Sequence, residues 1–470
     1  MQTFELYLAG EFVKTATKLT ITEKHTGEVF AKTYLANRTI LEKAIEIAEA
    51  SKIQLAEWPL YERYATLMEI STKITVSRIE LATLLSRESG KPMVHALAEI
   101  DRSAQTFSVA ASACRSLSGE IIRMDWTAVG KGKEGFIQFF PVGTVAGISP
   151  FNFPMNLAVH KIAPAIAAGC PIILKPATAT PLSTLALAKI IATTRLPLGA
   201  LSVLPCDRET GMGLVTDERI KLLSFTGSPQ VGWQMKEKCG KKKTVLELGG
   251  NAGVIICASS DLKDIIQKCI NGAFAYSGQV CIHAQRFFVH RSHYVTFIEL
   301  MKEAAMQLKK GSPLDTATQF SVMIDEENAL RVDQWVNEAI NEGAKVILRG
   351  SRLRNYLDPI ILTETRANMK VRKEEVFGPV ICIEPFDTTE EAINLVNEGR
   401  FGLQCGVFTS LIEELDMSFK RLEVGGVIHN DVPTLRLDHM PYGGVKDSGL
   451  GREGVKYAML DMLETRILVK

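Results

Sequence analysis

The chain has 470 residues, of which 46% are hydrophobic and 23% charged, with a formal net charge of +1. This length predicts two or three domains with a substantial core, and the near-neutral charge gives no reason to expect nucleic acid or an anionic membrane as a partner. Nine cysteines without a Cys-x-x-Cys pair, and eight histidines without metal-ligand spacing, argue against a disulfide framework or a metal site. We therefore expect a cytoplasmic globular protein without a bound metal, a secretory signal or a membrane span.

The first third of the chain predicts short strands followed by helices and a hairpin. Residues 1–35 alternate apolar and polar residues between glycine and charged breaks, a pattern typical of strands. In residues 38–87 apolar residues recur at helical spacing, and residues 89–92 end that stretch before a further helix over residues 93–117. Residues 120–140 then form two β-rich arms around a Gly/Lys-rich turn, which predicts a long hairpin.

The predicted hairpin indicates an oligomer. Its strand edges need a cover, and a second subunit is the usual one, although a solvated hairpin is the alternative. The segment TRILVK near the C-terminus is a predicted strand that can extend the same sheet. We therefore expect a homodimer or a homotetramer.

Two long regions alternate apolar strands with helices, the first over residues 143–250 and the second over residues 259–432. Such alternation predicts α/β domains with parallel sheets covered on both faces. Parallel sheets bind ligands beyond the carboxyl ends of their strands. The functional site is therefore expected on loops that follow strands of the first region, namely SPFNFP, KPATATP, FTGSPQVG and ELGGN.

Cys281 is the leading candidate for a nucleophile. It follows Ser277 and Gly278 on a flexible loop that leads into the predicted strand FFVH, so its thiol can reach a pocket. A lone cysteine is more often buried and inert, which is the alternative.

Two further residues suit acid–base and electrostatic roles. Glu247 lies within an apolar predicted strand, where desolvation raises the pKa of a carboxyl group toward that of a general base. Asn152 is a neutral amide between aromatic and proline residues, as an oxyanion donor requires. The alternatives are an outward-facing strand glutamate and an ordinary turn asparagine.

The segment 225–232 and two charged residues are candidates for a nucleotide site. Glycines at a strand-to-helix turn let a phosphate group approach backbone N–H groups, although turn glycines without a ligand are the alternative. Lys175, at the end of a predicted strand, and Glu375, before a Gly-Pro break, can each hydrogen bond to ribose hydroxyls or remain in solvent.

The segments SPFNFP, LKPA, FTGSPQVG, LELGGN, SGQVC, EEVFGPV and PYGGVKDSGLGREG occur in the order and spacing of the aldehyde dehydrogenase superfamily, which the chain resembles along essentially its whole length. The resemblance implies an α/β fold with a Rossmann-type parallel-sheet cofactor domain, an α/β catalytic domain and a β oligomerisation arm. It assigns residues 1–119 and 141–247 to the cofactor-binding domain, 248–440 to the catalytic domain, and 120–140 and 441–470 to the arm and tail. The implied activity is the NAD- or NADP-dependent oxidation of an aldehyde to the carboxylate.

By the same resemblance, Cys281 is the nucleophile, Glu247 is the general base, and Asn152 with the backbone N–H of Cys281 forms the oxyanion hole. The implied cofactor contacts are Ser149, Pro150, Phe151, Lys175, Thr178, Gly227, Ser228, Gly232, Leu248, Glu375 and Phe377. The CoA-acylating branch of the family generally lacks the glutamate, so Glu247 favours thioester hydrolysis over acyl transfer to CoA. A CoA-acylating enzyme, a non-catalytic binding protein and a cofactor-free thioesterase are the alternatives.

Thr178 departs from many NAD-preferring relatives, which carry a glutamate three residues after the position of Lys175. A glutamate there repels a 2′-phosphate, whereas threonine is short and neutral. We therefore expect NADP as the cofactor, with NAD as the alternative.

The segment DVPTLRLDHMPYGG resembles the substrate-facing loop of the family and carries Arg436 and His439, and His283 follows the nucleophile by two residues. These polar and cationic side chains suit a small polar or anionic aldehyde, such as lactaldehyde, a semialdehyde, or a phosphorylated or sulfonated three-carbon aldehyde. In the alternative, Arg436 faces solvent or pairs with Asp438, and His283 is a packed loop histidine.

Overall fold

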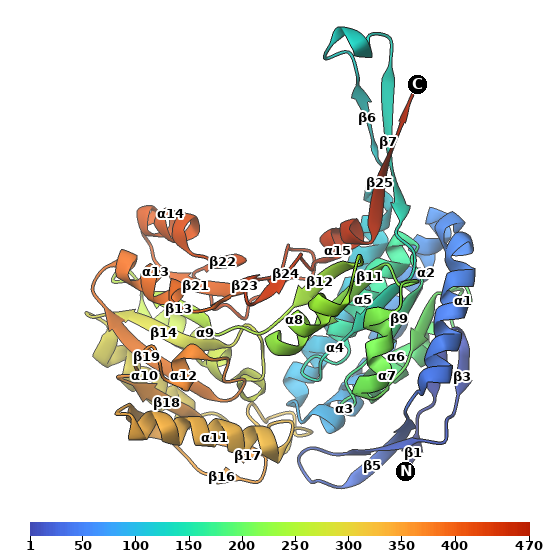
Figure 1. Ribbon diagram of the computed structural model, residues 1–470. Helices are drawn as coiled ribbons and strands as arrows, with labels where there is room; N and C mark the ends of the chain where they lie inside the picture. The colour runs from blue at the N-terminus through green and yellow to red at the C-terminus, as the bar shows by residue number, and fades with distance from the viewer.

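The computed structural model describes residues 1–470 and is built around two large sheets (Figure 1). The strand order of the first sheet is β24 (Gly449–Leu450), β12 (Lys243–Glu247), β11 (Leu222–Thr226), β8 (Val145–Ile148), β9 (Ile172–Lys175), β10 (Leu201–Val203), β2 (Leu6–Leu8) and β3 (Glu11–Val13). The five strands from β12 to β10 run parallel, and the three outer strands pair antiparallel with their neighbours.

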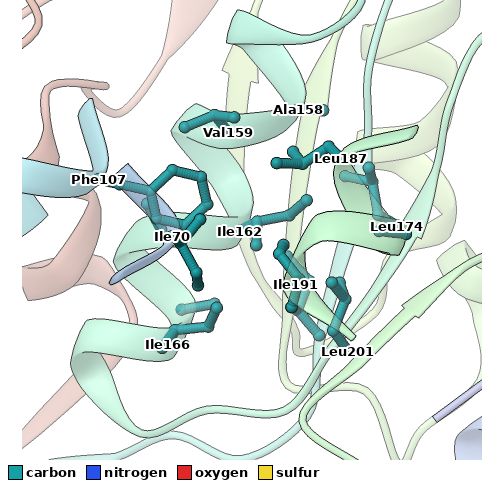
Figure 2. Packing of buried hydrophobic residues seen from close by; sticks show 14 of the residues in the cluster. Ile70, Phe107, Ala158, Val159, Ile162, Ile166, Leu174, Leu187, Ile191 and Leu201 are labelled. Atoms are coloured by element: carbon teal, nitrogen blue, oxygen red, sulfur yellow. The ribbon is translucent and has the colours of Figure 1, made fainter. Parts of the chain in front are cut away.

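Helices cover both faces of this first sheet because successive side chains of a strand point to opposite faces. Leu174 packs into the core formed with one set of helices, and Figure 2 shows it beside Ile162 and Leu201. The neighbouring Ile173 packs into a separate core on the other face. The first set is α2 (Leu60–Val76), α3 (Arg78–Ser89), α4 (Met93–Ser116), α5 (Asn156–Ala168) and α6 (Leu182–Ile191), and the second is α1 (Arg38–Glu57), α7 (Arg208–Thr216) and α8 (Pro229–Lys238).

The second sheet has seven strands, all parallel except the edge strand β15. The order is β15 (Lys345–Arg349), β18 (Ile360–Thr363), β19 (Val380–Phe386), β14 (Ala284–His290), β13 (Ala252–Ile256), β21 (Gln404–Phe408) and β22 (Gly426–His429). Its helices are α9 (Leu262–Phe274), α10 (Tyr294–Met306), α11 (Glu326–Asn341), α12 (Lys370–Lys373), α13 (Thr389–Asn397) and α14 (Ile412–Arg421). Both predicted α/β regions are therefore present.

An arm projects from the body of the molecule (Figure 1). Its hairpin strands are β6 (Glu120–Arg123) and β7 (Glu134–Pro141), joined through a short 3₁₀ helix η1 (Ala128–Gly130). The strand β25 (Leu463–Val469) adds to the other edge of β7 in an antiparallel register. The predicted hairpin and the predicted C-terminal strand are thus both present and belong to one sheet.

The residues before β25 do not belong to the arm, which differs from the assignment of 441–470 as a whole to arm and tail. β24 pairs with β12 at the edge of the first sheet. Helix α15 (Val455–Asp461) buries Val455 and Met459 in the same core as α4 and α5. The amphipathic spacing of these apolar residues explains the packing, and only β25 continues into the arm.

The remaining elements are short. A small sheet at the N-terminus has the order β1 (Gln2–Thr3), β5 (Val29–Tyr34) and β4 (Lys18–Thr22). Two-stranded pairs are formed by β16 (Arg352–Leu353) with β17 (Tyr356–Leu357) and by β20 (Phe401–Gly402) with β23 (Val445–Lys446). No helix of the chain has the length and apolar character needed to cross a membrane.

Candidate active site

A cavity of about 700 Å³ lies where the carboxyl ends of β8, β9, β11 and β12 face the loops of the second sheet. Parallel strands end at one edge, so the four loops expected to carry the site all reach this cavity. The predicted residues that line it are Ser149, Pro150, Phe151, Asn152, Lys175, Thr178, Gly227, Ser228, Glu247, Leu248, Cys281, Glu375 and Phe377. Gly232 lies behind the cavity on α8, where a Cβ would approach a methyl group of Leu248 to 2.4 Å, so it permits close packing of helix and strand.

A strained turn delivers Cys281 to the cavity. Tyr276, Ser277 and Gly278, in the 3₁₀ segment η2 (Ala275–Gly278), have φ values of 48°, 54° and 71°. A Cβ at Gly278 would lie 2.2 Å from the carbonyl oxygen of Gly378, so this position requires glycine. Consecutive left-handed residues of this kind cost free energy and cluster at functional sites. The turn leaves the thiol half-buried, whereas the other eight cysteines are buried.

The electrostatic surroundings of the thiol favour its neutral form at rest. Burial raises the pKa of Cys281 to about 11. A hydrogen bond with Tyr442 and the positive charge of Arg436 act in the opposite direction, while Glu375 and Glu247 add to the increase. The Sγ atom lies 3.0 Å from the hydroxyl oxygen of Tyr442.

The side chain of Asn152 is held in one orientation. Its Nδ2 donates to the carbonyl oxygen of Gln279 at 2.9 Å, and its Oδ1 accepts from the backbone N–H of Phe153 at 3.1 Å. An amide nitrogen carries two hydrogens, so one N–H remains for a ligand. Asn152 is therefore a fixed, neutral donor on the cavity wall.

Glu247 ends β12 and is buried with no hydrogen-bond partner on either carboxylate oxygen. Burial and the negative charge of Glu453 raise its pKa well above the ordinary value, although Arg436 and Lys161 partly oppose this. Glu453 behaves differently: burial disfavours its ionised form, but Lys161 at 2.9 Å and Arg436 at 2.8 Å hold its pKa well below the usual range. Two neighbouring carboxylates with pKa values moved apart are typical of acid–base sites.

The other end of the cavity suits a nucleotide. Ser228 is the N-cap residue of helix α8 and makes no side-chain capping hydrogen bond, so N–H groups of the first turn are available to a phosphate group. Ser149 Oγ is buried without a partner, which leaves a hydroxyl for a ligand. Glu375 accepts from the N–H of Gly250 at 3.0 Å, and a Cβ at Gly249 would approach its Oε2 to 2.1 Å, so this carboxylate needs a glycine beside it.

The model of the aldehyde dehydrogenase family matches residues 12–468. The chain belongs to this family. The expected family and fold class are therefore confirmed.

Three similar proteins show which kinds of aldehyde dehydrogenase this chain resembles. The 3-sulfolactaldehyde dehydrogenase of Priestia aryabhattai is 38% identical over 467 residues, which is 99% of this chain and 98% of that protein. The crystal structure of aldehyde dehydrogenase 21 from Physcomitrella patens, in complex with the reaction product succinate, has a TM-score of 0.98 and 43% identity, covering 100% of this chain and 98% of the other. Glyceraldehyde-3-phosphate dehydrogenase from Methanocaldococcus jannaschii, complexed with NADP, has a TM-score of 0.92 and 38% identity, covering 96% and 98%.

None of the three predicted substrate residues lines the cavity of this aldehyde dehydrogenase. His283 is buried, and its Nε2 lies 2.8 Å from the carbonyl oxygen of Ala273, so it is a packed loop histidine and the prediction of a substrate contact is wrong. Burial lowers its pKa to about 4, which keeps the imidazole neutral. His439 is exposed to solvent and does not line the cavity.

Arg436 fits neither of the two alternatives that the sequence left open, namely exposure to solvent and an ion pair with Asp438. It is not in solvent, since its side chain is 6% exposed, and it pairs with Glu453 at 2.8 Å rather than with Asp438. Asp438 is paired instead with Arg102 at 2.7 Å and with His160 at 2.8 Å. The guanidinium of Arg436 lies 3.8 Å above the ring of Tyr442, whose hydroxyl contacts the thiol of Cys281.

Sequence reasoning assigned no role to several residues of the site. Tyr442 and Glu453 lie within the quoted motif PYGGVKDSGLGREG, so the signal was present, but their partners are distant in sequence. Lys161 lies on α5, where an apolar run gives no reason to expect a buried ammonium group. Asn328, Arg331 and Trp335 on α11 line the cavity without any motif to mark them.

Proposed function

We propose that this aldehyde dehydrogenase oxidises a small polar or anionic aldehyde to the carboxylate with NADP or NAD, through a thioester on Cys281. The observation that carries the proposal is the convergence of Cys281, Asn152 and Glu247 on one cavity, beside a wall suited to a nucleotide. The similar proteins act on or bind short molecules with a second polar or charged group, as the names sulfolactaldehyde, succinate and glyceraldehyde-3-phosphate state.

In the proposed mechanism Cys281 releases its proton to water, and the resulting thiolate adds to the aldehyde carbonyl. The free N–H of Asn152 and the backbone N–H of Cys281 stabilise the oxyanion. The bound cofactor supplies a hydride acceptor, which lets the adduct become a thioester. Glu247 then takes a proton from the water that attacks the thioester, and its raised pKa brings it closer to the working pH of a general base.

Hydrolysis is favoured over the alternatives by the state of Glu247. Both of its carboxylate oxygens lack protein partners, so they are free to bind and activate water. A CoA-acylating enzyme has to protect the thioester from water, and a base in this position opposes that. A cofactor-free thioesterase does not need a nucleotide site beside its nucleophile, and a non-catalytic binding protein does not need the nucleophile. Neither alternative therefore explains why the two features share one cavity.

For the cofactor, we propose that Ser149, Ser228 and the start of α8 hold the pyrophosphate side and that Lys175 and Glu375 hold ribose hydroxyls. Thr178 lines the same wall and places no negative charge near a 2′-phosphate, which favours NADP. The edge-to-face pair of Phe151 and Phe377, with ring centroids 5.8 Å apart, is positioned to enclose the nicotinamide end. The remaining predicted contacts, Pro150, Gly227, Gly232 and Leu248, shape the backbone around it.

We also propose the assignment of domains and the assembly. Residues 1–119 and 141–247 are the cofactor-binding domain, and 248–440 are the catalytic domain. The arm of β6, β7 and β25 joins subunits in a homodimer or homotetramer, because it leaves Trp126 90% and Val129 81% exposed. The nine free cysteines suit a reducing compartment, which favours the cytoplasm.

Arg436 is the proposed anchor for a second anionic group on the substrate. Its Nε is buried without a partner, and it lies beside the ring that contacts the nucleophile. One unpaired donor on a cation behind the cavity can attract a carboxylate, sulfonate or phosphate group of a short aldehyde.

The test is reduced-cofactor production with NADP and with NAD over a panel of aldehydes, using Cys281→Ala as control. The panel sets lactaldehyde, succinic semialdehyde and a sulfonated or phosphorylated three-carbon aldehyde beside an alkyl aldehyde. The polar and anionic members are expected to have the higher kcat/KM. Turnover of none of them would overturn the proposed activity, and a preference for the alkyl aldehyde would overturn the substrate class alone.

A further inference from the structure

The hydroxyl of Tyr442 lies within hydrogen-bond distance of the thiol of Cys281. Its oxygen lies 3.0 Å from the Sγ of Cys281, and the tyrosine side chain is buried. In the resting thiol either atom can donate the hydrogen. Once Cys281 ionises, only the phenol carries a hydrogen, so the tyrosine becomes the donor and the sulfur the acceptor.

A closed cycle of contacts holds Tyr442 in this position. Its backbone exchanges two hydrogen bonds with Glu453, at 2.9 and 2.6 Å. The side chain of Glu453 holds Arg436 at 2.8 Å, and the guanidinium of Arg436 lies 3.8 Å above the tyrosine ring. The other carboxylate oxygen of Glu453 is bound by Lys161 at 2.9 Å, which fixes the acid in turn. The ring therefore has little freedom to move its hydroxyl away from the sulfur.

We propose that Tyr442 is a catalytic residue whose hydroxyl donates a hydrogen bond to the Cys281 thiolate and so prepares the nucleophile for attack. The proposal deepens the function assigned above and rests on Cys281 being the nucleophile. It differs from a packing role for the aromatic ring, because it requires the hydroxyl group and not the ring alone.

The charged groups around the sulfur agree with this role. Glu247, on β12, and Glu375, on the loop after α12, oppose ionisation of Cys281, and so does burial. Tyr442 and Arg436 are the groups that favour it. Burial, followed by the charge of Cys281, raises the pKa of Tyr442 well above its ordinary value, so the phenol keeps its hydrogen throughout the working range.

The experiment is the rate of alkylation of the full-length protein by iodoacetamide as a function of pH, with Tyr442→Phe compared with the wild type. The other eight cysteines are buried, so the reaction reports on Cys281, and Cys281→Ala gives the background. Loss of the donor is expected to raise the pH of half-maximal alkylation by about one unit. At about pH 8 the rate falls about three- to tenfold, since a more basic thiolate is also a better nucleophile and recovers part of the loss.

Tyr276→Phe is the matched control. It also removes a buried phenol hydroxyl beside the same turn, but that hydroxyl donates to the carbonyl oxygen of Ser89 at 2.9 Å and not to the sulfur. The pH profile of alkylation is expected to stay at the wild-type position. An equal displacement in both variants, or none in Tyr442→Phe, would overturn the proposal.

A second variant covers the case in which Tyr442→Phe does not fold. Replacement of Tyr442 by 3-fluorotyrosine keeps the ring and the hydroxyl but makes the phenol more acidic and a stronger donor. The pH of half-maximal alkylation is then expected to fall rather than rise, whereas a purely steric role predicts no change. These alkylation measurements do not depend on turnover. If Cys281→Ala abolished aldehyde oxidation while both Tyr442 variants kept the wild-type pH profile of alkylation, the proposed function would stand and only the role of the Tyr442 hydroxyl would be refuted.

Discussion

Replacing Glu247 with glutamine is expected to slow turnover and to stabilise the fold in the same variant. The glutamate is buried without a partner, and its pKa is raised above 4.5. Above pH 4.5 the unfolded chain has already released this proton, while the folded protein still holds it. The folded state therefore loses stability as the pH rises from 4.5 toward the folded pKa, by about 1.4 kcal/mol for each unit of pKa difference. Glutamine cannot ionise and avoids this loss.

The stability advantage of Glu247→Gln should thus be small at about pH 5 and grow toward about pH 8, as measured by urea unfolding at both values. Turnover should fall by about 10²- to 10⁴-fold, because the proposed general base is missing. A rapid burst of reduced cofactor equal to the enzyme concentration should remain, since Cys281 and Asn152 are unchanged. The exposed Glu218→Gln is the control and should alter neither property. Loss of the burst together with turnover, or a stability difference independent of pH, would refute the reasoning.

Four further variants test other parts of the site and the arm. Thr178→Glu should lower kcat/KM for NADP by tenfold or more while that for NAD changes little, and equal losses would contradict a 2′-phosphate near this residue. Gly249→Ala places a methyl group 2.1 Å from the Glu375 carboxylate and should raise KM for either cofactor, with kcat for a saturated enzyme less affected. Arg436→Ala should raise KM for succinic semialdehyde about tenfold and that for an alkyl aldehyde much less; an unchanged value for the anionic aldehyde would remove the anchor. Deletion of residues 464–470 uncovers β7 and should reduce the assembly measured by light scattering.

Much of the site could be predicted because its residues lie next to regular elements. Asn152, Lys175 and Glu247 each end or follow a strand of one parallel sheet, so recognising the strands was enough to place them at one edge. Cys281 was marked by the glycine before it, and the structure explains why that glycine is needed.

The rest depends on contacts that have no local pattern. Tyr442 reaches Cys281 across 161 residues, and Lys161 reaches Glu453 across 292, so no spacing in the sequence reports either pair. His283 shows the opposite error: closeness to Cys281 in sequence suggested a shared pocket, but the turn directs the imidazole toward α9. Glu453 is the partner of both Arg436 and Lys161. Neither pair could be predicted, because Glu453 lies on a segment that returns from the second sheet to the first.

That returning segment has a consequence for the synthesis of the protein. The edge of β12 is closed only by β24, which follows Glu247 by about 200 residues, and the N-terminal core is completed only by α15. At about 5–20 residues per second, a ribosome needs about 10–40 s to supply them. During that time the nascent chain carries an uncovered strand edge and an open apolar surface, both of which chaperones recognise. Cys281 is made well before Arg436 and Tyr442, so the candidate site becomes complete only once that later segment has been made.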